Sequence, residues 1–369
     1  MKAPPARLLL PHPRTWPRRA WRLFDAVRRD RAPARHPRLT RFFIRLAWGY
    51  AVALLCLWLL LFAADRWWVA TVLMYSPRWL FSLPLLAFLA ALLVLRRRAL
   101  VWPLLVGTFV LLFAVMQLCL PWRGALAFGG SPDARIRVLT LNADNVDLDA
   151  AKLKALLDEV KPDVVALQAW RSRHERPAFG PRDGAATWHL ARDGELFVAS
   201  RFPVSPAGKL VHPAFAGYDG TAAAYDVSAP MGNVRLYNLH LATPRDGLEA
   251  VIDEWWDGAD EMDETSALRR DQSEAVSQWA GGFSGPTLVV GDFNTPPDSA
   301  IYRTFWSGYT NAYTAAGFGF GNTHFTRRTS VRIDHVLAGP GWRCRRAWVG
   351  PYVGSLHRPV IADLEWVGE

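Results

Sequence analysis

Three long apolar runs near the amino terminus restrict what this chain of 369 residues can fold into more than any other feature. Residues 46–64 form an uninterrupted apolar stretch, residues 80–95 form a shorter one, and residues 99–121 form a third with Pro103 near its start. A helix of about 20 apolar residues spans a hydrocarbon core of roughly 30 Å. Three such runs in close succession have no globular shell in which to hide, so we predict three transmembrane helices.

The arginines around these runs predict how the chain is oriented. Residues 1–45 carry 13 Lys or Arg and two acidic residues, and Arg96, Arg97 and Arg98 lie between the second and third runs. Because Lys and Arg in short loops stay on the cytoplasmic side, we expect the amino terminus in the cytoplasm. Three crossings then place the rest of the chain on the opposite face, which for a bacterial inner membrane is the periplasm.

The charge of the chain changes after the third run. Residues 1–121 hold 18 Lys or Arg and three acidic residues, whereas residues 122–369 hold 25 and 30, a net charge of −5. The overall charge of +10 therefore does not describe the exported part, and a nucleic-acid partner is disfavoured because it would need basic contacts with its phosphates. We predict a basic cytoplasmic tail (1–45), a three-helix transmembrane anchor (46–121), a linker (122–134) and a folded domain (135–369).

The three cysteines indicate how that domain is stabilised. Cys56 and Cys119 fall inside the predicted spans, which leaves Cys344 as the one thiol of the exported part. A single thiol forms no intradomain disulfide. We therefore expect the domain to be stabilised by its hydrophobic core, for which it is large enough.

From residue 135 onward, short apolar strands alternate with a few amphipathic helices. Asp149 is expected to cap a helix that stops at Lys161-Pro162, and Thr265 is expected to cap a second one. Mixed strands with few helices predict a two-sheet α/β sandwich. The expected strands are 136–141, 164–167, 196–200, 222–227, 234–241, 287–290, 332–337 and 359–364.

Polar residues follow the buried strand 287–290. Asp292 and Asn294 are two residues apart, so on an extended chain their side chains point to the same side of the sheet. A carboxylate and an amide in this position suit a hard divalent cation and a phosphate oxygen bound beside it.

Six further motifs stand in a fixed order with this one. The seven motifs are LNAD (141–144), VVALQ (164–168), ASRFPV (199–204), NLHL (238–241), GDFN (291–294), RIDHVL (332–337) and SLHRPV (355–360). Together they resemble the endonuclease/exonuclease/phosphatase superfamily, in a type anchored to a bacterial membrane. The resemblance covers residues 135–365 and implies hydrolysis of phosphodiesters or phosphomonoesters with Mg²⁺ or Mn²⁺, on substrates that in this family include DNA, RNA, sphingomyelin and inositol phospholipids.

The resemblance also implies roles for individual residues. His357 matches the histidine that activates water or stabilises the phosphoryl group, and Asp334 matches the carboxylate that orients it. A carboxylate in this position fixes the tautomer of an imidazole and raises its basicity. His240 resembles a second catalytic histidine. The other matches are Asp292 and Asn294, which hold metal and phosphate, Asn142, which supports the substrate side of the site, and Asp144, an acidic group near the metal.

Two positions depart from the family pattern. The family usually has Leu-Gln-Glu where this chain ends its second motif with Ala169, and that Glu is the main metal ligand. It usually has Ser-Asp-His where this chain has Leu356 before His357, and that Asp lies close to the same metal. Because Mg²⁺ binds through carboxylates, substrate phosphates and water, both changes weaken one cation site.

A strongly acidic segment is one place for a replacement ligand. Residues 244–266 hold nine acidic residues and Arg245, with Trp255 and Trp256 in the middle. The segment is either a lid that carries a replacement carboxylate or a solvated acidic helix. In the second case the tryptophans pack on the domain or contact the membrane surface.

Two classes of function remain open. The first is a membrane-tethered, metal-dependent phosphoesterase on the non-cytoplasmic face, with a lipid headgroup or a small phosphoester favoured as substrate and a nuclease as a further alternative. Arg332 and Arg358 belong to a local basic set that we expect to bind the substrate phosphate. The second is a pseudoenzyme that binds a phosphorylated ligand or partner without turnover. Membrane lipids and a phosphoester are thus the expected partners.

Overall fold

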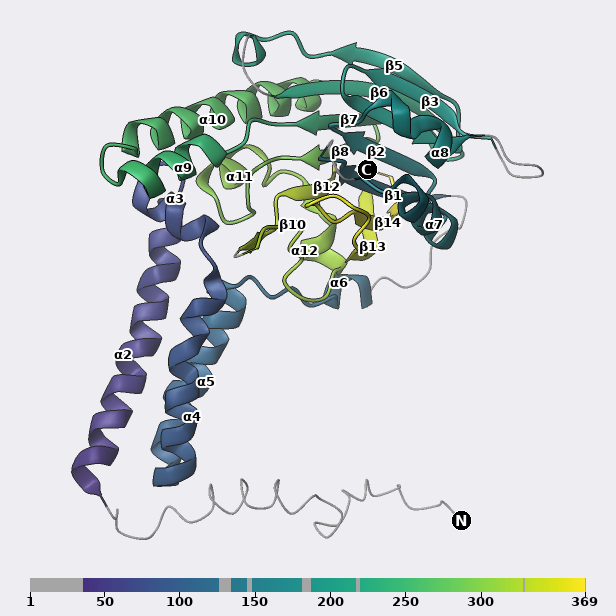
Figure 1. Ribbon diagram of the computed structural model, residues 1–369. Helices are drawn as coiled ribbons and strands as arrows, with labels where there is room; N and C mark the ends of the chain where they lie inside the picture. The colour runs from purple at the N-terminus through teal and green to yellow at the C-terminus, as the bar shows by residue number, and fades with distance from the viewer. Residues whose placement is uncertain are drawn as a thin grey trace, which may run out of the picture. The chain divides into compact units, whose positions relative to one another are not determined.

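The computed structural model divides the chain into two compact units (Figure 1). The first consists of Met1–Leu57 and Trp79–Val115, and the second of Trp58–Arg78 and Met116–Glu369. Residues 1–35 of the predicted tail and 126–133 of the predicted linker lie outside the described residues, which are 36–125, 134–144, 148–180, 187–216, 220–327 and 329–368.

Three helical stretches of the described chain are long and apolar enough to cross a membrane. They are Pro37–Leu61, Arg78–Leu95 and Arg98–Val115. The first corresponds to α2; the second comprises η2 (Arg78–Ser82) and α4 (Leu83–Leu95); the third comprises η3 (Arg98–Leu100), α5 (Val101–Phe109) and the π-helix η4 (Val110–Val115). The helix α2 begins at Pro37, well before residue 46, because proline is well suited to the first helical position.

The third stretch ends earlier than the sequence predicted. Helix stops at Val115 rather than at residue 121, and Gln117 has a φ of +56°, a left-handed conformation that terminates a helix. The apolar run predicted that Cys119 lies inside the third span. This prediction is wrong, because the helix ends before Cys119. Cys119 is buried in the second unit, where its backbone pairs with that of Gly319. The second unit thus contains two buried thiols, Cys119 and Cys344.

The second unit is built on two six-stranded sheets and a two-stranded one, which confirms the predicted two-sheet sandwich. The first sheet has the order β13 (Trp342–Val349), β14 (Val360–Trp366), β1 (Arg135–Asn142), β2 (Val164–Gln168), β4 (Leu196–Ser200) and β3 (His189–Asp193). The second has the order β5 (Val204–Lys209), β6 (Thr221–Ala229), β7 (Gly232–His240), β8 (Thr287–Asp292), β12 (Asp334–Ala338) and β9 (Thr310–Asn311). A short ribbon pairs β10 (His324–Phe325) with β11 (Ser330–Val331).

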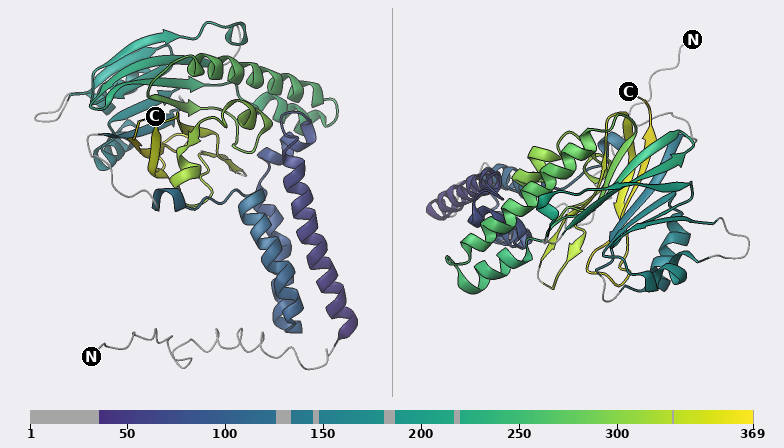
Figure 2. Two further views of the ribbon diagram at one scale, coloured as in Figure 1. Left: turned by 180° about the vertical axis from the view of Figure 1, so that it is seen from behind. Right: turned by 90° about the horizontal axis from the view of Figure 1, so that it is seen from above.

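Three hydrophobic clusters hold these layers together. Inward residues of both sheets, such as Val138 and Val290, form the cluster between them. A second cluster joins the first sheet to α7 (Ala150–Val160) and α8 (Glu175–Phe179). A third joins the second sheet to α10 (Ala259–Gly281) and α11 (Ala300–Phe305). Figure 2 shows the helices on the outer faces of the two sheets. Helix α6 (Trp122–Ala125) precedes the sandwich, and α12 (Ala312–Ala316) packs beside β13.

Local signals explain some of the helix boundaries. Asp149 caps α7 by accepting hydrogen bonds from the amides of Ala151 and Lys152, as predicted. Thr265 does not cap a helix, because α10 has already begun at Ala259 with acidic residues in its first turn, a favourable place for negative charge. The hydroxyl of Thr265 instead donates to the carbonyl of Met262 within the helix.

The register of the second sheet brings three of the predicted site residues into one row. Residue His240 of β7 pairs with Asp292 of the parallel strand β8. Asp292 in turn pairs with Asp334 of the antiparallel strand β12. Directly paired residues project to the same face of a sheet, so the ends of three adjacent strands place an imidazole and two carboxylates side by side.

Candidate active site

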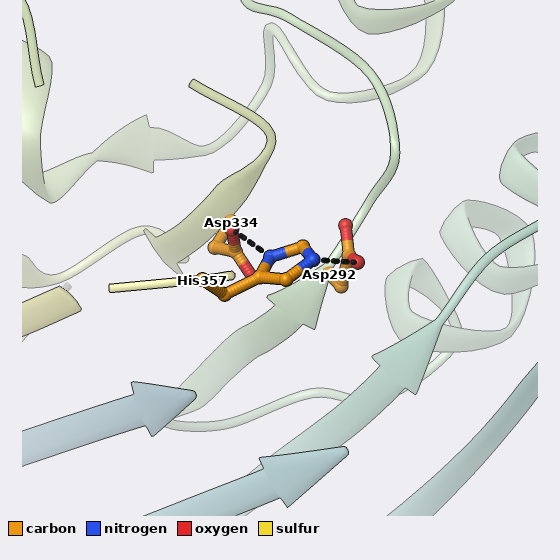
Figure 3. A group of neighbouring side chains, drawn as sticks. All are labelled: Asp292, Asp334 and His357. Carbon is orange, nitrogen blue, oxygen red and sulfur yellow. Dashed lines mark hydrogen bonds and ion pairs between the residues drawn. The ribbon is translucent and has the colours of Figure 1, made fainter. Parts of the chain in front are cut away.

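A buried carboxylate–histidine pair forms the centre of the site (Figure 3). The two carboxylate oxygens of Asp334 lie 3.1 and 2.9 Å from Nδ1 of His357. The backbone amide of His357 donates to Ser355 Oγ, which itself donates to the carbonyl of Asn142. The hydroxyl of Thr323 accepts from the backbone amide of Asp334. Both members of the pair are thus fixed by their own backbone contacts, as the predicted role of Asp334 requires.

The surrounding charges decide the protonation of His357. Burial alone would lower its pKa, but the carboxylates of Asp334 and Asp292 outweigh that effect and raise the pKa to about 9. The imidazole is therefore a cation at neutral pH in the metal-free protein. The neighbouring ring of His324 lies 4.6 Å away between centroids. Burial and the charge of His357 lower the pKa of His324 to about 4, so this second imidazole is neutral.

A second carboxylate–histidine pair lies on the other side of Asp292. Nδ1 of His240 is 2.8 Å from Oε1 of Glu195. This hydrogen bond lowers the pKa of Glu195. Burial alone would lower the pKa of His240, but Glu195 and Asp292 outweigh burial and raise it. Sequence reasoning missed Glu195, which lies in the turn between β3 and β4 and belongs to none of the seven motifs. Its position after Asp193-Gly194, before an apolar strand, was the available signal.

The two imidazoles present their remaining nitrogens to a common point. Nε2 of His357 and Nε2 of His240 each lie 3.8 Å from Oδ2 of Asp292. The amide of Asn142 donates to the same oxygen at 2.8 Å and lies 3.4 Å from Nε2 of His240. Asp292 is 1% exposed, and burial together with the charge of Asp334 raises its pKa. Side chains from β1, from β7 and from the loop before β14 therefore converge on one buried carboxylate.

Asn294 is held in a strained backbone conformation beside this carboxylate. Its φ is +47°, which a non-glycine residue keeps where its surroundings fix it. The backbone N–H of Asn294 donates to Oδ1 of Asp292, and its side-chain nitrogen Nδ2 donates to the carbonyl of Leu241, both at 2.8 Å. Its carbonyl accepts from the hydroxyl of Tyr75 at 2.8 Å. Tyr75 was not predicted as a site residue, because it precedes the domain by some 60 residues.

These groups line a pocket of about 530 Å³. Its polar lining residues include Asn142, Asp144, Glu195, His240, Asp292, Asn294 and His357. Its apolar and aromatic lining residues include Tyr75, Leu248, Val331, Ile333 and Leu356. All of the residues predicted to be catalytic except Asp334 line this pocket, and Asp334 lies behind His357. A polar group and an apolar group of one ligand can thus be bound together.

The two departures from the family pattern both open into this pocket. Ala169 lies in the left-handed region, with a φ of +47°, and lines the pocket. Leu356 also lines the pocket and is 46% exposed. Both positions of the pocket lining therefore carry an apolar side chain where the resemblance implies a carboxylate.

The oxygen donors that remain are a partial set for a divalent cation. Asp292, Asp334 and His357 lie close enough to form a cluster, but the oxygens of Asp334 already face His357. Asp144, Glu195, Glu249 and Asp292 line the pocket as carboxylates, together with Asn142 and Asn294, and Glu195 is already bonded to His240. Such a set fits a cation that is held loosely and completed by water and substrate phosphate.

Two predicted substrate ligands point elsewhere. The guanidinium of Arg332 is buried and donates to Sγ of Cys119 and Oε1 of Gln117. The guanidinium of Arg358 lies over the rings of Phe325 and Tyr352. Neither side chain is among the described residues that line the pocket, which corrects the assignment made from charge alone. A buried guanidinium needs acceptors nearby, and for Arg332 these lie in the chain that follows the third candidate span.

The acidic segment forms two helices rather than one. Helix α9 (Arg245–Glu254) and helix α10 are joined at Trp255, whose φ is +59°. Arg245, Leu248 and Glu249 of α9 line the pocket. Of the acidic residues in this segment, Glu249 is therefore the best candidate for the predicted replacement metal ligand.

The two-sheet sandwich and the paired carboxylate–histidine groups around Asp292 are typical of the phosphoester hydrolase folds. The profile of the endonuclease/exonuclease/phosphatase family matches residues 139–359, more than half of the chain. The chain belongs to this family, whose members are generally hydrolases that act on phosphoesters.

Solved structures similar to the chain share its fold at low sequence identity. A humanized D. rerio TDP2 is 17% identical, with a TM-score of 0.48, and the match covers 63% of this chain and 99% of that one. An endonuclease/exonuclease/phosphatase from Beutenbergia cavernae is 18% identical, with a TM-score of 0.44, over 64% and 72% of the chains. The 3' phosphatase NExo from Neisseria is 18% identical, with a TM-score of 0.44, over 63% and 100%. No curated protein matches the sequence.

Proposed function

We propose that the protein is a membrane-tethered phosphoesterase that acts on a phosphodiester or phosphomonoester at the non-cytoplasmic face. The observation that carries this proposal is the convergence of two carboxylate-oriented imidazoles on one point beside Asp292. The protonated imidazole of His357, the ring N–H of His240 and the amide of Asn142 form a suitable site for phosphoryl oxygens, and a hydrogen bond from a charged donor is about twice as strong as a neutral one.

Each residue then has a defined role. His357, protonated and held by Asp334, neutralises the charge that develops on the phosphoryl group. His240, held by Glu195, donates to a second phosphoryl oxygen or gives its proton to the leaving group. Asp144 and Asp292, with Asn294, would hold a Mg²⁺ or Mn²⁺ ion, which when bound supplies positive charge to the phosphate.

The apolar residues of the pocket lining support a lipid headgroup as substrate. Leu248, Val331 and Ile333 line the pocket and belong to a cluster that also contains Leu61, the last residue of the first candidate span, and Met74, which follows that span. A phosphoester with an apolar tail would place its phosphate against the imidazoles and its tail against these apolar residues. A small phosphoester would use the polar lining residues alone.

Topology gives this proposal its first test. Residues 58–78 and 116–369 pack into one unit, so an even number of crossings must separate them; two are supplied by the second and third candidate spans. The arginine-rich tail then places both segments outside the cytoplasm. We expect a reporter fused after Glu369 to be silent if it is active only in the cytoplasm and active if it works only outside. The opposite pattern would refute the assigned side.

A pseudoenzyme is the second candidate, and the absence of carboxylates at Ala169 and Leu356 favours it. A pocket with the same imidazoles and a weakened cation site would still bind a phosphate group. In that case the protein would act as a receptor for a phosphorylated ligand rather than as a catalyst.

An assay of the purified full-length chain separates the two candidates. We expect hydrolysis of a p-nitrophenyl phosphodiester, p-nitrophenyl phosphate or a phospholipid in mixed micelles, with a rate that increases when Mg²⁺ or Mn²⁺ is added. Lipid turnover that exceeds turnover of both nitrophenyl esters would favour the lipid headgroup. If none of the three is hydrolysed with either metal, while inorganic phosphate still binds, the receptor function is supported instead.

A further inference from the structure

The chain between the first two candidate spans folds onto the second unit and contributes to the pocket. After Leu61 the chain turns and forms α3 (Trp68–Tyr75), which lies beside α9 and α10 (Figure 1). Its apolar residues pack with Ile333 in one buried cluster, and the ring of Trp68 meets that of Trp256 edge to face at 5.1 Å. This segment is therefore part of the folded domain, although it precedes the family match in sequence.

A buried ion pair fixes the place where this segment docks. Nη2 of Arg269 lies 3.1 Å from Oδ1 of Asp65, and both side chains are fully buried. The adjacent Arg270 donates to the carbonyl of Asp65 at 2.7 Å. Asp65 has a φ of +65°, and its amide donates to the hydroxyl of Thr71. Because either charge would be left buried and unpaired without the other, the segment has one docked position.

Tyr75 connects this ion pair to the site. Its side chain is buried, and its hydroxyl accepts from Nη1 of Arg269 at 3.0 Å while donating to the carbonyl of Asn294 at 2.8 Å. Burial raises the pKa of Tyr75 further above its ordinary value, so the hydroxyl keeps its proton. A continuous chain of contacts thus runs from Asp65 through Arg269 and Tyr75 to Asn294.

The loop that carries Asn294 is held by the segment at two points. Besides the Tyr75 contact, Nη1 of Arg78 forms an ion pair with Oδ2 of Asp298 at 2.7 Å. Asn294 is in a left-handed conformation and lines the pocket beside Asp292. Its own side chain bonds to Leu241, so the hydroxyl of Tyr75 is the contact that sets the orientation of its carbonyl.

We propose that Tyr75 is a positioning residue of the active site that acts through Asn294, and that residues 62–78 are a component of the site. The segment between two membrane spans then holds a site residue in its working geometry. Substrate turnover depends in this way on how the membrane-linked segment is docked. The kinetic readout rests on the proposed function, whereas a phosphate-binding readout does not.

A double-mutant cycle in the full-length chain tests this role. Tyr75→Phe, Asn294→Ala and the double variant are compared for kcat, KM, affinity for inorganic phosphate and midpoint of thermal unfolding. We expect Tyr75→Phe to lower kcat by about 10-fold, the effect of one buried hydrogen bond, and to leave KM nearly unchanged. In the Asn294→Ala background the same substitution should change kcat by less than about 2-fold, because residues that act as a unit are not additive. Tyr50→Phe is the matched control, since the hydroxyl of Tyr50 also donates to a backbone carbonyl, that of Phe81 in the first unit, and kcat should not change.

The outcomes are distinguishable from failure of the proposed function. Equal effects of Tyr75→Phe in both backgrounds, or a lower unfolding midpoint with an unchanged kcat, would overturn the positioning role. If the wild type hydrolyses no phosphoester, the proposed function fails, and the cycle is then read from phosphate affinity. A Tyr75→Phe effect on that affinity that disappears with Asn294→Ala supports the inference, and an affinity that Tyr75→Phe leaves unchanged overturns it.

Discussion

Replacing His357 by Ala is expected to lower the hydrolysis rate by ~10²-fold or more, the scale of a positioned general acid–base group. His357 presents Nε2 to the point where the phosphate is expected to bind, and its other nitrogen is held by Asp334. Its loss removes both the positive charge and the hydrogen-bond donor. Steady-state kinetics on the full-length variant, with a p-nitrophenyl phosphodiester as substrate, give the measurement.

Asp334→Asn separates the contribution of the positive charge on His357 from that of its hydrogen-bond donor. The substitution keeps the shape but removes a negative charge, so the pKa of His357 should fall from about 9 toward its ordinary value. If the protonated imidazole is the active form, the rate of the variant should decline at a lower pH than that of the wild type. His189→Ala, which changes an exposed histidine of β3, is the control and should leave the profile unchanged. Activity that survives both His357→Ala and Asp292→Ala would place the chemistry elsewhere.

The sequence was sufficient to predict residues that lie at the ends of strands. His240, Asp292 and Asp334 each terminate or begin an apolar strand, and strand pairing brings such ends to one edge of a sheet. The pattern of apolar strands predicted the sandwich and placed Asp292 after a buried strand, whereas His240 and Asp334 were predicted from the resemblance of their motifs to the family. The same reasoning correctly predicted the Asp149 cap, because that signal is local.

Contacts between distant segments could not be predicted in the same way. Glu195 and Tyr75 reach the site from a turn and from a short helix between two candidate spans. The turn before Glu195 carries a local signal, but no signal in the adjacent sequence shows that either residue reaches the site. Arg332 shows the opposite case, since a charged residue within a motif suggested a ligand while its guanidinium is turned toward Gln117 and Cys119. The charge of a residue does not predict which side of a strand its side chain faces. For Arg332 that side is determined by hydrogen-bond acceptors many residues away in the sequence.

The largest gain is expected from restoring the two missing carboxylates. Ala169→Glu with Leu356→Asp returns negative oxygen to positions that line the pocket beside Asp292. Because Ala169 is already in the left-handed region, Glu requires no new backbone conformation there. Leu356 is 46% exposed, so a carboxylate at that position stays in contact with solvent. Ala169 is 8% exposed and lines the pocket, so a bound cation must offset the cost of burying the charge of Glu at that position. We expect the double variant to bind Mg²⁺ or Mn²⁺ at least ~10-fold more tightly than the wild type, since two carboxylates near a divalent cation interact strongly with it.

The controls for this prediction are matched in shape and in exposure. Ala169→Gln with Leu356→Asn has the same size without charge and should leave metal affinity near that of the wild type. Leu190→Asp places a carboxylate at a position in β3 that is equally exposed, 46%, and outside the set of described pocket residues, so it should have no effect. Calorimetric titration of the full-length variants with each metal, together with phosphodiester turnover, measures the result.

A double variant that binds metal no better than its uncharged counterpart would show that these positions are not the missing half of a cation site. A wild type that already binds metal tightly and turns over rapidly would mean that another carboxylate has taken over, and Glu249 of α9, which lines the same pocket, is then the residue to replace by Gln.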